Sequence, residues 1–108
     1  MTDQAIATLY MTADNEEEVR RIAHVLVEEK LIACANIIPS ILSVYCWEGN
    51  IEEAMEVAVL MKTRRCLAKK AIMRITELHS YDIPCVTVWD VSDVQPDYQN
   101  WVYQNTVS

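Results

Sequence analysis

The chain has 108 residues, of which 52% are hydrophobic, and a formal net charge of −7 at pH 7. This length fits one domain, residues 1–108, and the hydrophobic share can fill a core, which excludes a disordered chain. The acidic charge disfavours nucleic acids and anionic membranes as partners. No run of about 18 apolar residues occurs, so no transmembrane helix is expected.

A first strand is predicted over residues 5–12, a short apolar run. Asp14 follows it, with Glu17 three residues later, which is the capping-box pattern of a helix start. A helix over residues 15–30 then carries one apolar stripe. The stripe consists of Val19, Ile22, Ala23, Leu26 and Val27.

Two long β-prone runs follow, at residues 32–47 and 51–62. Gly49, the only glycine of the chain, lies between them. It predicts a tight hairpin because its backbone takes positive φ without steric cost. Pro39 cannot donate to a strand ladder, so we expect a bend or bulge there. Both runs exceed the usual strand of about 5–6 residues, so they overhang a small domain.

The second half of the chain predicts two helices and one strand. Thr63 is expected to cap a helix over residues 64–78, and residues 79–84 form a loop. Residues 85–91 are predicted as a strand with apolar residues on both faces, as in the interior of a sheet. Pro96 opens a last helix, residues 96–105. The order βαββαβ plus a terminal helix predicts an α+β sandwich, with two helices on one face of a four-stranded antiparallel sheet.

Such a sheet leaves one face bare, with β-branched and aromatic residues of the two long strands on it. Monomers expose apolar patches of only ~300–600 Å², so a larger patch favours assembly with further copies of the chain. Tyr45, Trp47, Tyr98 and Trp101 are candidate interface anchors, because aromatic residues concentrate in interfaces. The alternative is that these rings belong to the core of the single chain.

Four cysteines occupy positions 34, 46, 66 and 85. None is spaced Cys-x-x-Cys, and no His-x-x-x-His pair occurs, so no zinc motif is readable. The first four residues, Met1-Thr2-Asp3-Gln4, lack the basic patch and apolar stretch of a secretory signal. This favours the cytoplasm, where thiols stay reduced and unpaired.

Several groups of residues together resemble the CutA family of divalent-cation tolerance proteins. They are Ala33-Cys34-Ala35-Asn36-Ile37-Ile38-Pro39, Ser43-Val44-Tyr45-Cys46-Trp47-Glu48-Gly49, Leu60-Met61-Lys62-Thr63 and His79-Ser80-Tyr81-Asp82-Ile83-Pro84, with Glu56, Tyr98 and Trp101. The resemblance covers roughly residues 6–104. It implies a ferredoxin-like fold, a tight homotrimer and a link to copper.

Copper ligation in this family is associated with a cysteine on the first strand and histidines before the Pro-Tyr loop. These positions match Met11, Leu78 and His79, so only His79 keeps its type. The thioether of Met11 suits Cu(I) better than Cu(II), because it carries no negative charge. The resemblance therefore implies a metal site at His79 and Met11 that favours Cu(I). The alternative role of His79 is a hydrogen bond that tethers the loop.

The resemblance also implies a polar cleft between subunits. Its matching residues are Cys34, Tyr45, Trp47, Glu56, Lys62, Tyr81 and Cys85, with Trp101 as a further interface residue. Cys85 stands where the family has a carboxylate. Glu56 and Lys62 have equal parity on one strand but lie about 20 Å apart along it, so they do not pair directly.

Three functions remain open at this point. The first is a cytoplasmic homotrimer that binds copper or other divalent cations. The second is a trimer that resembles PII signalling proteins and binds a small ligand in its clefts, although a chain with one glycine has no Gly-rich phosphate loop. The third is an enzyme with a cleft cysteine, such as Cys34 paired with His79. No catalytic set is readable, so enzymatic activity is not expected.

Overall fold

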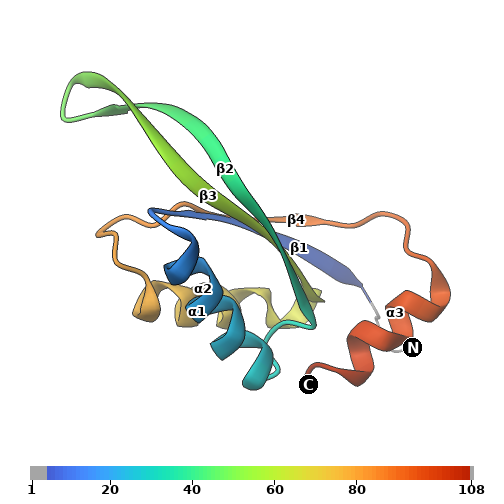
Figure 1. Cartoon of the computed structure of the whole chain (residues 1–108). Helices are drawn as coiled ribbons and strands as arrows, with labels where there is room; N and C mark the ends of the chain where they lie inside the picture. The colour runs from blue at the N-terminus through green and yellow to red at the C-terminus, as the bar shows by residue number, and fades with distance from the viewer. Residues whose placement is uncertain (1–4, 108) are drawn as a thin grey trace.

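Four strands and three α-helices make up the fold of residues 5–107, the range that the computed structural model describes (Figure 1). In chain order they are β1 (Ile6–Ala13), α1 (Glu16–Glu28), β2 (Cys34–Trp47), β3 (Asn50–Arg64), the short 3₁₀ helix η1 (Arg65–Leu67), α2 (Ala68–Leu78), β4 (Val86–Asp90) and α3 (Pro96–Gln104). The predicted order of strands and helices is confirmed. Residues 1–4, on which the expectation about a secretory signal rests, lie outside the described range.

The strands form one antiparallel sheet in the order β2-β3-β1-β4, and α1 and α2 lie against one of its faces (Figure 1). Odd-numbered residues of β1 and β3 point to this face, where Leu9, Met11, Val59 and Met61 are fully buried in the core. Side chains alternate along a strand, so even-numbered residues of β1 and β3 lie on the opposite face. We call this second face, which neither α1 nor α2 covers, the open face.

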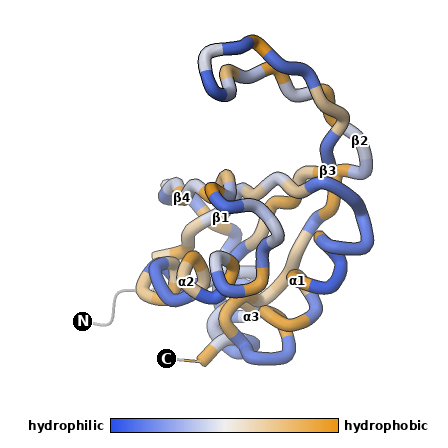
Figure 2. The backbone as a smooth tube through the Cα atoms, turned by 90° about the vertical axis from the view of Figure 1, so that its left-hand side faces the viewer, coloured by the Kyte–Doolittle hydropathy of each residue, from blue (hydrophilic) through white to orange (hydrophobic). Residues whose placement is uncertain are grey.

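β2 and β3 form a hairpin that extends well beyond the rest of the sheet. In the described chain β1 pairs with residues 57–64 of β3, which leaves residues 50–56 paired with β2 alone. This overhang projects away from the two-layer body and brings the longest dimension of the molecule to 49 Å (Figures 1 and 2). The predicted overhang is therefore confirmed.

The turn and the bulge of the hairpin follow from single residues. Glu48 and Gly49 form the turn with φ values of 50° and 83°, as the tight two-residue hairpin loop with two positive φ angles requires. The strand pairing shifts register between Ile38 and Ile41. This irregularity confirms the bulge predicted at Pro39, which has no N–H to offer the ladder.

Two helix starts differ from the prediction. Asn15, not Asp14, caps α1, and its side-chain oxygen accepts the backbone N–H of Glu18 at 2.8 Å. Both residue types are good caps, so composition does not separate two adjacent candidates. Thr63 is not a helix cap, because β3 continues to Arg64 and the Thr63 hydroxyl instead donates to the carbonyl of Leu31 at 2.7 Å.

The position of β4 also corrects a prediction. β4 lies at an edge of the sheet beside β1, not in the interior. Its apolar residues have two separate partners: Val86 and Val88 pack against the core, whereas the Trp89 ring stacks on Tyr10, with ring centroids 6.4 Å apart. A strand that is apolar on both faces therefore does not reveal how many strands flank it.

α3 packs at the end of the sheet, where Ile6 and Val102 form a small second core. Arg64 at the end of β3 fixes this helix, since its guanidinium donates to the carbonyl of Tyr103 at 2.7 Å and to the hydroxyl of Thr106 at 2.8 Å. This arrangement brings α3 beside the start of β2.

Candidate functional site

A cavity of about 560 Å³ lies between the hairpin and the loop that precedes β4. It is lined by Tyr10, Thr12, Ser43, Tyr45, Trp47, Glu56, Tyr81, Asp82, Ile83 and Cys85. The sheet register explains why the hairpin residues meet there. β2 pairs Ile41 with Glu56, and side chains opposite each other share a face. Ser43, Tyr45 and Trp47 have the same parity as Ile41 and therefore lie on the same face as Glu56. The N–H of Thr12 donates to the carbonyl of Cys85 at 3.4 Å, which holds the loop beside β1.

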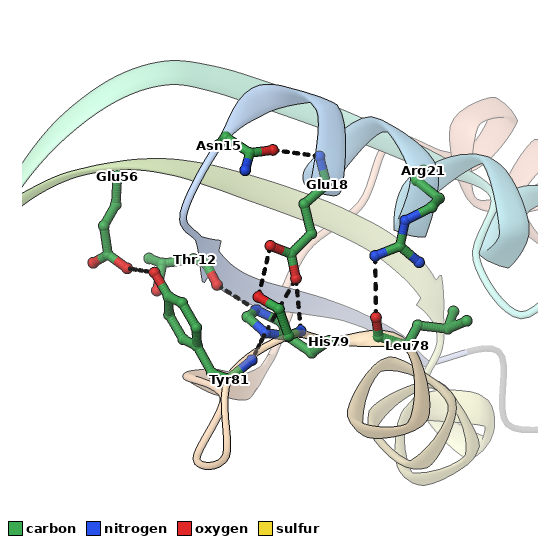
Figure 3. A network of polar contacts seen from close by, with 9 residues as sticks. Thr12, Asn15, Glu18, Arg21, Glu56, Leu78, His79 and Tyr81 are labelled. Carbon is green, nitrogen blue, oxygen red and sulfur yellow. Dashed lines mark hydrogen bonds and ion pairs between the residues drawn. The ribbon is translucent and has the colours of Figure 1, made fainter.

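Tyr81 and Glu56 connect two walls of this cavity. Tyr81 donates its hydroxyl to Oε2 of Glu56 at 2.7 Å (Figure 3). Burial raises the pKa of Tyr81 well above its usual value, and the hydrogen bond to Glu56 and the charges of Glu56, Asp14 and Glu18 raise it further. The Tyr81 hydroxyl therefore keeps its proton and acts as a donor at neutral pH.

His79 holds the loop in place. Its Nε2 lies 2.8 Å from the carbonyl oxygen of Thr12, and its Nδ1 accepts the backbone N–H of Tyr81 at 3.1 Å (Figure 3). Because Nδ1 accepts, the ring proton is on Nε2 and donates to Thr12. Glu18 adds a second tie, since its carboxylate accepts the N–H of Ser80 at 2.7 Å and the Ser80 hydroxyl at 2.8 Å. The loop is thus tied to both β1 and α1.

The two predicted metal ligands, Met11 and His79, already make other contacts in the structure. Met11 is fully buried in the core, and both ring nitrogens of His79 already make hydrogen bonds. A histidine binds a metal through a ring nitrogen with a free lone pair, so a metal ion at His79 would displace a hydrogen bond of the loop. Within residues 5–107, no three His, Cys, Asp or Glu side chains are grouped so as to hold a metal ion.

A second cluster lies where β2 begins. Sγ of Cys34 and the hydroxyl of Tyr98 are 3.2 Å apart, and Cys34 pairs with Lys62 in the sheet register. The Tyr98 ring stacks on Trp101, with ring centroids 5.7 Å apart. Burial, followed by the contact with Cys34, raises the pKa of Tyr98 to about 12.

The residues predicted for the cleft therefore fall into two groups. The cavity brings together Tyr45, Trp47, Glu56, Tyr81 and Cys85. The second cluster holds Cys34, Lys62 and, through Tyr98, Trp101. A single chain does not unite the two groups in one site.

Some cavity residues were not predicted from the sequence. Tyr10 and Thr12 are the even-numbered members of a strand whose odd-numbered residues are apolar and buried, and this alternation was the signal that they face the open side. Ser43 shares the parity of Tyr45 and Trp47, two residues of the cleft that the family resemblance implies. Asp82 had no signal beyond its place in the loop.

Other predictions about exposure and thiols are resolved by the fold. All four cysteines are unpaired, as predicted. Tyr45, Trp47, Tyr98 and Trp101 keep between 37% and 48% of their surface exposed, so the alternative that they form the core of the single chain is wrong. In the described part of the chain, no helix is long and apolar enough to cross a membrane.

Comparison with known proteins extends this description. The sequence matches the family described as CutA1 divalent ion tolerance protein over residues 7–105. The Divalent-cation tolerance protein CutA of Pyrococcus horikoshii is 41% identical over 98 residues, which cover 91% of this chain and 95% of that protein. Protein CutA of Mus musculus is 36% identical over 104 residues, which cover 96% of this chain and 59% of that longer protein.

The fold leads to the same family. The crystal structure of divalent ion tolerance protein CutA1 from Ehrlichia chaffeensis matches with a TM-score of 0.93 and 36% identity, covering 99% of this chain and 100% of that chain. The likeness confirms a mixed α and β fold with a four-stranded antiparallel sheet. The family match includes both the cavity and the second cluster. The chain therefore belongs to the CutA1 family of divalent ion tolerance proteins.

Proposed function

We propose that the chain works as a cytoplasmic homotrimeric divalent-cation tolerance protein that binds its ligand in a cleft built around the cavity. The observation that carries this proposal is the hairpin overhang, where residues 50–56 of β3 pair with β2 alone and one face presents exposed apolar side chains. The sheet order β2-β3-β1-β4, with α1 and α2 on one face, supports a ferredoxin-like topology.

The overhang supports the proposed assembly. Leu42, Val44, Ile51 and Met55 lie on one face of it, each between 59% and 82% exposed. Trp47 lies on the other face, toward the cavity. Burying such side chains is favourable by about 25 cal/mol per Å², and further copies of the chain supply matching apolar hairpins. A closed ring of three copies covers every hairpin equally.

We propose Cu(I) as the preferred metal, because thiol and thioether donors suit Cu(I) better than Cu(II). Of the soft donors in the chain, we consider first Cys85, which lines the cavity together with Glu56 and Asp82, and the pair His79 and Met11. Cys85 takes precedence because its side chain is exposed, whereas Met11 is buried and His79 is hydrogen-bonded at both nitrogens. A neighbouring subunit would complete the ligand set.

Competition against a Cu(I) chelator, with calorimetry for Cu(II), tests the metal proposal. We expect measurable Cu(I) binding, poor Cu(II) binding, and about a tenfold loss of Cu(I) affinity in Cys85→Ser. Cys66→Ser is the matched control, since Cys66 is exposed but lies outside the cavity. A larger loss in His79→Ala than in Cys85→Ser would move the metal to His79. Tight Cu(II) binding that none of these variants changes would contradict the proposal.

The cavity favours a second candidate function, a PII-like trimer that binds a small organic ligand. Its volume of about 560 Å³ falls within the ~300–1,000 Å³ of typical ligand sites. A thermal-shift and calorimetric screen against ATP and common metabolites tests this candidate. Both candidates make the chain a binding protein, and we propose no catalytic activity for it.

A further inference from the structure

The cavity beside the hairpin carries charge of one sign. Its lining contains two carboxylates, Glu56 and Asp82, and no Lys, Arg or His among the described lining residues. An anionic ligand would find no counter-charge there, whereas a cation would find two. The lining thus selects against phosphate and carboxylate ligands.

The same cavity is rich in aromatic rings that come from different elements. Tyr10 stands on β1, Tyr45 and Trp47 stand on the overhang of β2, and Tyr81 stands on the loop after α2. A cation gains from several rings only when they enclose it from more than one side, because each ring attracts it through its face. The rings at this cavity come from three separate elements, so a cation bound there can contact aromatic rings from more than one element.

Glu56 supplies the counter-charge in this enclosure. Its Oε2 accepts the Tyr81 hydroxyl at 2.7 Å, and among residues 5–107 no donor engages its Oε1. Burial raises the pKa of Tyr10, and the electrostatic effects of Cys85 and Glu56 raise it further, so the negative charge of Glu56 also acts on Tyr10. Lys62 of the same chain lies six residues farther along the strand, about 20 Å away, too far to neutralise this carboxylate within one chain.

We propose that this cavity binds an organic cation, a substituted ammonium whose apolar groups contact Trp47, Tyr45 and Tyr10 while its charge faces Glu56. Aromatic faces attract such cations within about 6 Å of the ring centroid, and a cavity of about 560 Å³ is far larger than one bare metal ion needs. The inference rests on the second candidate function, for which it names the ligand class.

Calorimetric titration of the intact protein with choline and with its uncharged isostere 3,3-dimethylbutan-1-ol separates charge from shape. We expect choline to bind at least about tenfold more tightly than the isostere. Glu56→Gln keeps an acceptor for Tyr81 but removes the charge, and is expected to weaken choline about tenfold while leaving the isostere unchanged. Glu53→Gln is the matched control, with the same charge change on the opposite face of β3. It should leave choline binding intact.

Equal affinity for choline and the isostere, or no binding of either, would overturn the proposal. So would a loss in Glu53→Gln as large as that in Glu56→Gln, because the effect would then come from total charge. If circular dichroism shows that Glu56→Gln does not fold, Asp82→Asn supplies the same comparison at the second carboxylate. Binding of an uncharged or anionic metabolite in the screen, without choline binding, would leave the small-ligand function standing and remove only the ammonium class.

Discussion

Tyr81 and Glu56 lie 25 residues apart in the chain, and their side chains meet at 2.7 Å across the cavity. One belongs to the loop that His79 and Glu18 tie to the body of the protein, and the other to the strand that carries the overhang. The position of the hairpin is thereby linked to the position of the loop. The shape of the cavity depends on this pair.

Replacing Tyr81 with Phe removes this hydrogen bond while keeping the ring. We expect the free energy of unfolding to fall by about 1 kcal/mol, the usual contribution of one partly exposed hydrogen bond. Denaturant unfolding at fixed protein concentration measures it. Tyr45→Phe is the control, since no partner of the Tyr45 hydroxyl occurs within residues 5–107, and it should be neutral. Equal effects of the two variants would contradict the role given to the Tyr81–Glu56 pair.

The raised pKa of Tyr98 predicts that the free energy of unfolding declines in alkaline solution. Its pKa is raised from 10.0 to about 12 in the folded chain, so the folded state keeps a proton that the unfolded state loses. The contribution of Tyr98 to the free energy of unfolding is complete below about pH 10 and is lost as the pH rises through about 12. The decline of unfolding free energy over this range should be shallower in Tyr98→Phe. Parallel profiles of wild type and variant would refute the assignment.

His79→Ala removes a buried ring that makes two hydrogen bonds to the backbone. We expect a loss of about 2 kcal/mol in unfolding free energy, because buried backbone groups lose their partners. His24→Ala changes an exposed histidine of α1 and should stay within about 0.5 kcal/mol of wild type. If both variants unfold like wild type, His79 does not tether the loop.

Trp47→Ala separates the stability of the assembly from that of the single chain. Trp47 is 48% exposed in one chain, so its main burial is expected against another copy, where truncating a buried Trp costs about 3–5 kcal/mol. The variant should therefore dissociate at a higher protein concentration than wild type. Met73→Ala, at an exposed apolar residue of α2, is the comparison. Unchanged oligomer mass and melting temperature in Trp47→Ala would remove Trp47 from the interface.

Much of the fold was predictable because it depends on local patterns. The apolar stripe of α1, the lone glycine of the turn and the proline of the bulge each act on their own neighbourhood. The predictions that were wrong depend on information that local patterns of the sequence do not contain. Asp14 and Asn15 are equally good caps, and the edge position of β4 depends on which strands pair across the sheet.

The candidate site was predictable only in part, for the same reason. The resemblance named Tyr45, Glu56 and Tyr81, which the structure brings together. It also named Lys62 for a cleft between subunits, and within one chain Lys62 lies apart from Glu56 along the strand. The buried contacts of His79 join residues up to 67 positions apart, and no spacing rule in the sequence reports such a pairing.

The central claim is that the bare hairpin is covered by two further copies of the chain. Size-exclusion chromatography with multi-angle light scattering at micromolar concentration tests it most directly. We expect a single species with three times the chain mass of 12.4 kDa. A stable species of 12.4 kDa, with the hairpin accessible to solvent, would contradict it.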